Sequence, residues 1–274
     1  MECKERKVQD MPYKLIPAIQ MFTVRDFIQT PQGLYDSLKR VRDMGCKDVQ
    51  FSRVGQGIDP DYISSILKEL DMNVFVTHSP MNRIFGDLPA LIREHHAWGC
   101  DSLGLGNLDN SYLDDGYEGY TRFIRDIKPV TEELKKEGMT FAYHSHSFEF
   151  IRYHGKLMYE RLIEETDPET FHFIQDSFWM RYGGINHRKY MNRVAGRMEV
   201  LHVKDFTTRI GYFGECECMT GTLGEGNIDY TPLLQTCEDT GVKYLAIEQD
   251  RCLRDPFDCL ADAFAELKRV IEEK

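Results

Sequence analysis

The sequence predicts a single (β/α)8 barrel, and three observations support that prediction. From about residue 15 onward, short β-rich runs alternate with longer helical runs, and eight such units can be drawn. The length of 274 residues suits one barrel, which normally needs ~250. A doubly wound open sheet normally carries a Gly-rich phosphate loop after its first strand, but residues 20–26 (QMFTVRD) contain no glycine.

The strands are short runs rich in β-branched, aromatic and aliphatic residues. We expect them at 15–20, 47–51, 73–78, 101–105, 139–144, 171–176, 198–203 and 243–248. Helical patterns lie between them, near 31–44, 60–70, 87–98, 116–137, 156–166, 187–195, 229–240 and 257–272. Several of these helices are followed at once by a glycine, which closes a helix well: Gly45, Gly99, Gly138 and Gly241.

The amino-acid composition is typical of a globular protein, and the chain is acidic. The chain is 42% hydrophobic and carries 45 acidic against 34 basic residues, a formal net charge of −11. Nucleic-acid binding favours a basic surface, so this balance argues against a nucleic-acid partner. No run approaches the ~18 apolar residues of a membrane span. We expect a polar N-terminal arm at 1–13 and a single barrel domain at 14–274.

The eight cysteines form neither a disulfide set nor a zinc-finger pattern. Cys216 and Cys218 make a C-x-C pair without a second pair at the usual spacing, and two thiolates alone are an incomplete metal site. The N-terminus carries no apolar leader segment. We therefore expect free thiols in a cytoplasmic protein.

Polar side chains gather where four consecutive predicted strands end, at residues 143–149, 174–176, 200–205 and 247–250. Such barrels carry their active sites at the C-terminal ends of the strands. A glutamate, an aspartate, a histidine and a second glutamate meeting there would suit Mn²⁺, Mg²⁺, Co²⁺ or Zn²⁺. Each of these side chains, taken alone, is better explained as a helix cap or as a hydrogen-bond partner of a loop backbone. Together they predict a metal site, because gathered buried carboxylates repel one another without a cation.

Several motifs resemble the sugar phosphate isomerase/epimerase family of xylose-isomerase-like barrels, over nearly the whole chain. They are residues 20–26 (QMFTVRD), 144–150 (HSHSFEF), 176–179 (DSFW), 202–205 (HVKD), 224–230 (GEGNIDY) and 248–250 (EQD). The resemblance implies a metal-dependent isomerase or epimerase of a sugar or sugar derivative. It also implies one divalent ion (Mn, Co, Zn or Mg) with four ligands, Glu149, Asp176, His202 and Glu248.

Two positions depart from the ketose epimerase branch of that family. The strand-5 glutamate of that branch lies nearer the strand end, where this chain has Tyr143 or His144. Trp179 stands where the D-x-x-H motif of that branch and of the endonuclease branch has a histidine. Since an indole is neither a ligand nor a base, we expect Trp179 to be an apolar wall against the sugar or a core residue.

The implied reaction removes a proton next to a carbonyl group, through a metal-stabilised enediolate. Glu149 and Glu248 are the expected acid and base, facing the substrate from opposite sides. His146 is a rival base, because an imidazole can accept a proton at neutral pH, or it orients Glu149 instead. Further candidates for binding the substrate are Lys204, Trp179, Arg25, His78 and His144.

Ion pairs are the alternative explanation for both cations: Lys204 can pair with Asp205, and Arg25 can pair with Asp26 or with a neighbouring loop. We expect His95 and His96 on a helix surface, and residues 207–226 as a mobile cover over the strand ends.

Other functions remain as alternatives. A lyase on the same scaffold, such as an inosose-type dehydratase or the barrel subunit of a C-glycoside-cleaving enzyme, begins with the same proton abstraction. A metal-dependent endonuclease is disfavoured by Trp179 and by the charge of −11. A sugar-binding protein without activity fits only if the four ligands fail to converge. We expect a carbohydrate substrate, not necessarily phosphorylated, no membrane partner, and leave open a homodimer or homotetramer.

Overall fold

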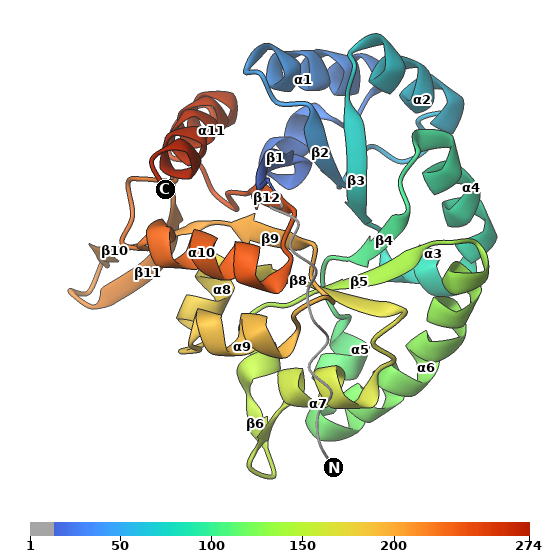
Figure 1. Cartoon of the computed structure of the whole chain (residues 1–274), viewed down its shortest axis with the longest axis vertical. Coiled ribbons are helices and arrows are strands. Elements are labelled where there is room, and N and C mark those ends of the chain that lie inside the picture. The colour runs from blue at the N-terminus through green and yellow to red at the C-terminus, as the bar shows by residue number, and fades with distance from the viewer. Residues whose placement is uncertain (1–13) are drawn as a thin grey trace.

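The computed structural model describes residues 14–274, and in it eight parallel strands form a nearly closed barrel surrounded by helices (Figure 1). The expected polar arm, 1–13, lies outside the described residues. The order of strands around the barrel is β3-β2-β1-β12-β9-β8-β5-β4. Their bounds are β1 (Ile16–Gln20), β2 (Asp48–Ser52), β3 (Asn73–His78), β4 (Ser102–Leu105), β5 (Thr140–His144), β8 (Phe171–Asp176), β9 (Val200–Val203) and β12 (Tyr244–Ile247).

The two strands at the ends of this order, β3 and β4, meet at a seam. The backbone N–H of Ser79 donates to the Gly104 carbonyl there, at 2.8 Å. A Cβ added to Gly104 would lie 2.1 Å from the carbonyl oxygen of Thr77, so only glycine permits this approach. The predicted (β/α)8 barrel is confirmed.

Helices cover the outside of the barrel (Figure 1). Eight of them match the expected helical segments closely: α1 (Pro31–Asp43), α2 (Pro60–Glu69), α4 (Leu88–Trp98), α6 (Gly116–Lys136), α7 (Met158–Glu165), α9 (His187–Arg193), α10 (Tyr230–Thr240) and α11 (Pro256–Glu272). Short helical segments follow some strand ends: η1 (Met21–Phe27), α3 (Met81–Gly86), α5 (Asn110–Leu113), η2 (Phe148–Phe150) and α8 (Ser177–Tyr182). A small hairpin, β6 (Arg152–Tyr153) with β7 (Lys156–Leu157), precedes α7.

Local sequence signals explain where these helices begin and end. Thr30 caps α1 by accepting a hydrogen bond from the backbone N–H of Gly33, with a proline at the first helical position. Gly99 and Gly241 close α4 and α10 in the left-handed conformation, as expected for glycines after a helix. The apolar faces of the helices pack on the outside of the strands and form the main hydrophobic core.

The segment expected as a mobile cover forms a hairpin. β10 (Asp205–Ile210) pairs antiparallel with β11 (Cys216–Gly221), and the hairpin extends to the edge of the molecule beside α10 (Figure 1). Its turn exposes Tyr212 and Phe213 almost fully. Cys216 and Cys218 lie on β11 and belong to no metal-binding group among the described residues.

One expectation about the helix surfaces is wrong. His96 is exposed, but His95 is fully buried on the inner face of α4. Its ring nitrogens lie 2.9 Å from the hydroxyl of Thr77 and 2.7 Å from the carbonyl of Leu91, and burial lowers its pKa to about 4. His95 follows Leu91 by one helical turn and therefore shares its buried face.

The seven described cysteines are all free thiols, so no disulfide joins any two of them. Within residues 14–274, no helix is both long enough and apolar enough to cross a membrane.

Candidate metal centre at the strand ends

The polar cluster arises directly from the two-residue period of the strands. Inside the barrel, a small apolar cluster fills the lower layer, with Ala142, Ile174, Val200 and Ala246 among its members. Two residues further along each of these four strands, the side chain again faces the barrel interior. Those positions are occupied by His144, Asp176, His202 and Glu248.

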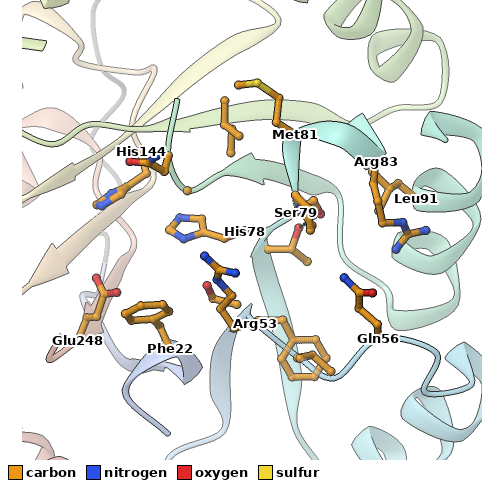
Figure 2. A pocket seen from close by; sticks show the side chains of 18 of the residues that line it. Phe22, Arg53, Gln56, His78, Ser79, Met81, Arg83, Leu91, His144 and Glu248 are labelled. Atoms are coloured by element: carbon orange, nitrogen blue, oxygen red, sulfur yellow. Dashed lines mark hydrogen bonds between the residues drawn. The ribbon is translucent and has the colours of Figure 1, made fainter. Parts of the chain in front are cut away.

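These four side chains converge. Each offers one nitrogen or oxygen atom, all four atoms lie within 4.8 Å of one another, and all four residues are buried. They come from the ends of β5, β8, β9 and β12, and His144 and Glu248 can be followed in Figure 2. His78, at the end of β3, forms a second such group with His144 and His202.

Protein hydrogen bonds orient three of the four side chains. The Asp176 Oδ1 atom accepts from the backbone N–H of Trp179 at 2.9 Å, because Asp176 caps α8. The Glu248 Oε1 atom accepts from the side-chain amide of Gln20 at 3.2 Å. His202 Nε2 lies 2.7 Å from Gln50 Oε1, which can only accept, so Nε2 is the donor of this hydrogen bond.

One atom of each residue makes no hydrogen bond to the backbone or to Gln20 and Gln50. These atoms are His144 Nδ1, Asp176 Oδ2, His202 Nδ1 and Glu248 Oε2. His144 Nδ1 has no partner, whereas Asp176 Oδ2 and Glu248 Oε2 face the ammonium group of Lys204 and the imidazole of His202. Buried carboxylates and imidazoles gathered this closely favour a bound cation. His202 Nδ1 and Glu248 Oε2 lie only 2.9 Å apart, close enough for both atoms to bind one ion. Two imidazole nitrogens and two carboxylate oxygens suit Zn²⁺, Mn²⁺ or Co²⁺, and the residues present therefore fit a divalent metal ion.

A buried lysine lies against the same carboxylates. Lys204 Nζ is 3.1 Å from Asp176 Oδ2, 3.0 Å from Glu248 Oε2 and 3.1 Å from Asp250 Oδ2. Burial alone would lower the pKa of the Lys204 ammonium group. The three carboxylates outweigh this effect, and the pKa is raised above its ordinary value. Lys204 therefore pairs with this cluster, and not with Asp205 as the ion-pair alternative proposed.

The same surroundings act on the carboxyl groups of the cluster. Burial raises the pKa of Asp176 to about 6, although Lys204 and His202 act in the opposite direction. Burial alone would raise the pKa of Glu248 as well. Lys204 and His202 outweigh this effect and hold the pKa of Glu248 well below its ordinary range. The cluster therefore contains at least one firmly ionised carboxylate beside a firmly protonated ammonium.

Glu149, expected as a ligand and as a catalytic group, belongs to neither group of converging side chains. It lies in the short helix η2 and is fully buried. Its carboxyl accepts hydrogen bonds from the Tyr143 hydroxyl at 2.5 Å and from the backbone N–H of His146 at 2.8 Å. Tyr143 faces away from the barrel interior, one position before His144. The structure therefore brings His144, and not Glu149, to the other three residues.

His146 and Trp179 lie beside the cluster. The His146 ring stacks on Phe148, its centroid is 4.6 Å from that of His144 and 5.1 Å from that of Trp179, and its Nδ1 atom has no hydrogen-bond partner. Burial lowers the pKa of His146 to about 3, so the ring is neutral at neutral pH. Trp179 lies 5.5 Å from Lys204 Nζ across its ring face.

Arg25 has a different position from the one expected for a substrate ligand. Its guanidinium donates to the carbonyl oxygens of Phe22 at 2.9 Å and Asp250 at 3.2 Å, and it lies over the Phe22 ring. It thus ties the end of β1 to the end of β12. It does not pair with Asp26 in the structure.

A cavity of about 860 Å³ opens above the cluster (Figure 2). Its wall at this end includes His144 and Glu248 of the cluster and the neighbouring residues His78, His146, Lys204 and Asp250. The cavity then extends away from the cluster, past β2 and the seam between β3 and β4, toward α4. A volume of this size accommodates a sugar-sized ligand.

Sequence reasoning overlooked three residues of this site. Gln20 and Gln50 orient Glu248 and His202, and Asp250 is the third partner of Lys204. The two-residue period could have found Gln20, which comes two positions after the inward-facing Ala18.

Comparison with known proteins places the fold. A family model described as xylose isomerase-like TIM barrel matches residues 38–269. The chain belongs to this family. The resemblance found in its motifs is thereby confirmed, and the strand-end cluster lies at the end of the barrel where such folds carry active sites.

Individual relatives of this xylose isomerase-like barrel are distant. The inosose dehydratase of Geobacillus thermodenitrificans (strain NG80-2) is 26% identical over 154 residues, which are 52% of this chain and 51% of that protein. The chain thus matches about half the length of its curated relatives.

Two solved structures show the same fold along almost the whole chain. A sugar phosphate isomerase/epimerase from Parabacteroides distasonis ATCC 8503 has a TM-score of 0.72 at 17% identity, covering 93% of this chain and 98% of that one. An L-ribulose 3-epimerase has a TM-score of 0.73 at 16% identity, covering 94% and 95% of the two chains. At these identities the likeness shows the fold alone.

Proposed function

We propose that this xylose isomerase-like barrel is a metal-dependent enzyme that removes the proton next to a carbonyl group of a sugar or sugar derivative. The observation that carries this proposal is the convergence of buried His144, Asp176, His202 and Glu248, of which His144 and Glu248 line a cavity of about 860 Å³. Perturbed ionisable groups that converge in a large cavity are the usual mark of an active site.

His144, Asp176, His202 and Glu248 would hold the ion. A divalent ion bound there supplies positive charge beside the carbonyl oxygen, where negative charge develops as the neighbouring proton leaves. Gln20 and Gln50 keep Glu248 and His202 in position for this role. Lys204 holds the carboxylates of Asp176 and Glu248 together and supplies a second positive charge at the cavity wall.

His146 is the proposed base. Its ring lines the cavity beside His144, and a neutral imidazole with an unpartnered nitrogen can accept a proton from a substrate carbon. Glu149 does not line the cavity, so we do not propose the pair of glutamates on opposite faces that epimerisation would use. A single base serves well when a proton moves between neighbouring carbons on one face, and we therefore favour isomerisation over epimerisation.

A lyase is the second candidate, and the dehydratase relatives favour it. The matched half of the chain is 26% identical to inosose dehydratase. Elimination begins with the same proton abstraction and needs no base on the opposite face. A lyase would therefore use the same residues, and the two candidates differ only in the steps after proton abstraction.

Metal binding tests the proposal directly. We expect about one Mn²⁺ per chain in the wild-type protein, loss of that ion in Glu248→Gln and His144→Gln, and retention in Glu149→Gln. Elemental analysis after dialysis against Mn²⁺ measures the content, and the Mn²⁺-dependent rise in melting temperature provides an independent measurement. Retention by His144→Gln together with loss in Glu149→Gln would instead support Glu149 as a ligand. No metal in any protein would contradict the proposal.

Product analysis separates the two candidates. In ordinary water with Mn²⁺ and a panel of ketoses and keto-glycosides, an isomerase yields products of the substrate's composition, and a lyase yields products lacking water or an aglycone. His146→Asn should lower kcat by about 10²-fold or more while Mn²⁺ binding persists. Unchanged kcat in this variant would remove His146 as the base.

A further inference from the structure

The part of the cavity that lies away from the metal cluster contains two arginines, and only one of them is neutralised (Figure 2). Arg83 forms a two-pronged ion pair with Glu94, at 2.9 Å and 2.8 Å. The Arg53 guanidinium has no hydrogen bond or ion pair with any described residue, and Figure 2 shows it directed into the cavity toward His78.

The other cations near the cavity are already satisfied. Lys204 is enclosed by three carboxylates, and Arg25, which does not line the cavity, is bound to two backbone carbonyls. Of the lysines and arginines that line the cavity within residues 14–274, Arg53 is therefore the one without an anionic partner. In a chain with a net charge of −11, an unpaired cation facing a cavity is a specific feature of the site.

The backbone holds Arg53 in this position at a cost. Its φ is +57°, a left-handed conformation that residues other than glycine rarely adopt. The Gln29 side-chain amide donates to the Arg53 carbonyl at 2.7 Å, and the backbone N–H of Gly55 donates to Ile28 at 3.0 Å. A Cβ added to Gly55 would lie 2.3 Å from the Gln29 carbonyl oxygen, so the turn packs tightly against the end of η1. Strain retained at a site is a reason to seek a role for the residue.

We propose that Arg53 binds a carboxylate on the substrate, at the end away from the metal cluster, so that the substrate is an acidic sugar derivative. This inference rests on the proposed function, because it names the substrate class of that same site. A guanidinium offers a planar pair of N–H donors that matches the two oxygens of a carboxylate. One unpaired positive charge balances one carboxylate, whereas a doubly charged phosphate would leave a negative charge near Asp109, which also lines the cavity.

Three matched sugars test the proposal by binding, without any need to know the reaction. D-glucose is neutral, D-glucuronate carries a carboxylate, and D-glucose 6-phosphate carries a phosphate. Calorimetric titrations use the full chain loaded with Mn²⁺. For the wild type we expect glucuronate to bind about tenfold more tightly than glucose. Arg53→Gln should abolish this preference, and Arg53→Lys should retain part of it.

Arg188→Gln is the matched control. Arg188 is exposed on α9 and lies outside the cavity, and its replacement by glutamine changes the net charge by the same amount as Arg53→Gln. We expect this variant to behave like the wild type. Since the Arg53 side chain is exposed and makes no hydrogen bond within the described chain, its variants should fold normally, which a thermal melt checks.

Each remaining outcome has a definite meaning. Equal binding of glucose and glucuronate by the wild type, or a preference that survives in Arg53→Gln, overturns the proposal. Tighter binding of glucose 6-phosphate than glucuronate, lost in Arg53→Gln, overturns the carboxylate assignment in favour of a phosphate. An Arg53-dependent preference for glucuronate in a protein that binds no Mn²⁺ would support the anion site while the proposed metal-dependent function fails.

Discussion

Glu149 is a buried carboxyl group that forms no ion pair with any lysine or arginine among residues 14–274. The Tyr143 hydroxyl and the His146 backbone N–H are its hydrogen-bond donors, and neither carries a charge. Burial raises the pKa of Glu149 from its ordinary value of 4.5 to about 7, and these two hydrogen bonds oppose the shift without cancelling it. Glu149 is therefore a group whose ionisation destabilises the folded chain.

This group makes stability depend on pH in a predictable direction. Between its ordinary pKa of 4.5 and its folded pKa of about 7, the unfolded chain binds fewer protons than the folded chain. The stability contributed by Glu149 is therefore complete below pH 4.5 and is lost as the pH rises through 7, by about 3 kcal/mol. In Glu149→Gln this component should be absent, so the difference in unfolding free energy between wild type and variant should change by that amount.

Urea denaturation at several pH values between 4 and 8 measures the effect. Glu132→Gln, which alters an exposed glutamate on α6, should keep the pH dependence of the wild type. Parallel profiles for wild type and Glu149→Gln would show that Glu149 ionises normally.

Among the structural elements, the hairpin β10–β11 and the loop after it depend on one aspartate. Asp205 begins β10, is buried, and accepts four backbone hydrogen bonds. The donors are the N–H groups of Phe206 at 2.8 Å, Gly224 at 3.0 Å, Gly226 at 3.1 Å and Ile228 at 3.2 Å. The HVKD and GEGNIDY motifs are thus linked, and Asp205 fixes the path from β9 to α10.

Asp205→Asn should therefore be costly although it changes little in shape. The amide group presents N–H donors to backbone N–H groups, so at least one buried donor loses its acceptor. We expect a loss of about 2–3 kcal/mol in unfolding free energy. Asp229→Asn is the control, because Asp229 is an exposed cap of α10 and asparagine caps helices equally well. Equal losses in the two variants would contradict the role assigned to Asp205.

At the scale of the whole molecule, the seam between β3 and β4 is the weak line of the barrel. The strand order begins at β3 and ends at β4, and the hydrogen bond from Ser79 to Gly104 bridges them. The cavity crosses this seam, since Thr77, Ser79, Leu105 and Gly106 all line it. The barrel is therefore least tightly closed where the proposed substrate would enter its distal part.

Hydrogen exchange should reveal this seam. We expect the Ser79 amide to exchange at least about tenfold faster than amides of β1 that pair with β12, because opening the seam breaks fewer bonds than separating a paired strand. Gly104→Ala should increase the difference, since its Cβ would meet the Thr77 carbonyl. Exchange measured by mass spectrometry on peptides covering 73–80 and 14–21 tests this. Equal protection in the two peptides would show a seam as firm as the rest of the barrel.

The sequence alone determined the barrel, its eight strands and its eight main helices, because these depend on local periodicity and on capping residues such as Gly99 and Gly241. It also identified Asp176, His202 and Glu248 as neighbours, because residues at the ends of adjacent parallel strands must lie together.

Only the tertiary structure decided the positions of residues that lie beyond a strand end or depend on a partner far along the chain. Glu149 lies five residues beyond β5, where the period of the strand no longer directs a side chain, and it turned toward Tyr143 while His144 faced the cluster. The contacts of Lys204 with Asp250, and of Gln50 with His202, join residues 46 and 152 positions apart. Such contacts arise when the barrel closes, and no local pattern encodes them.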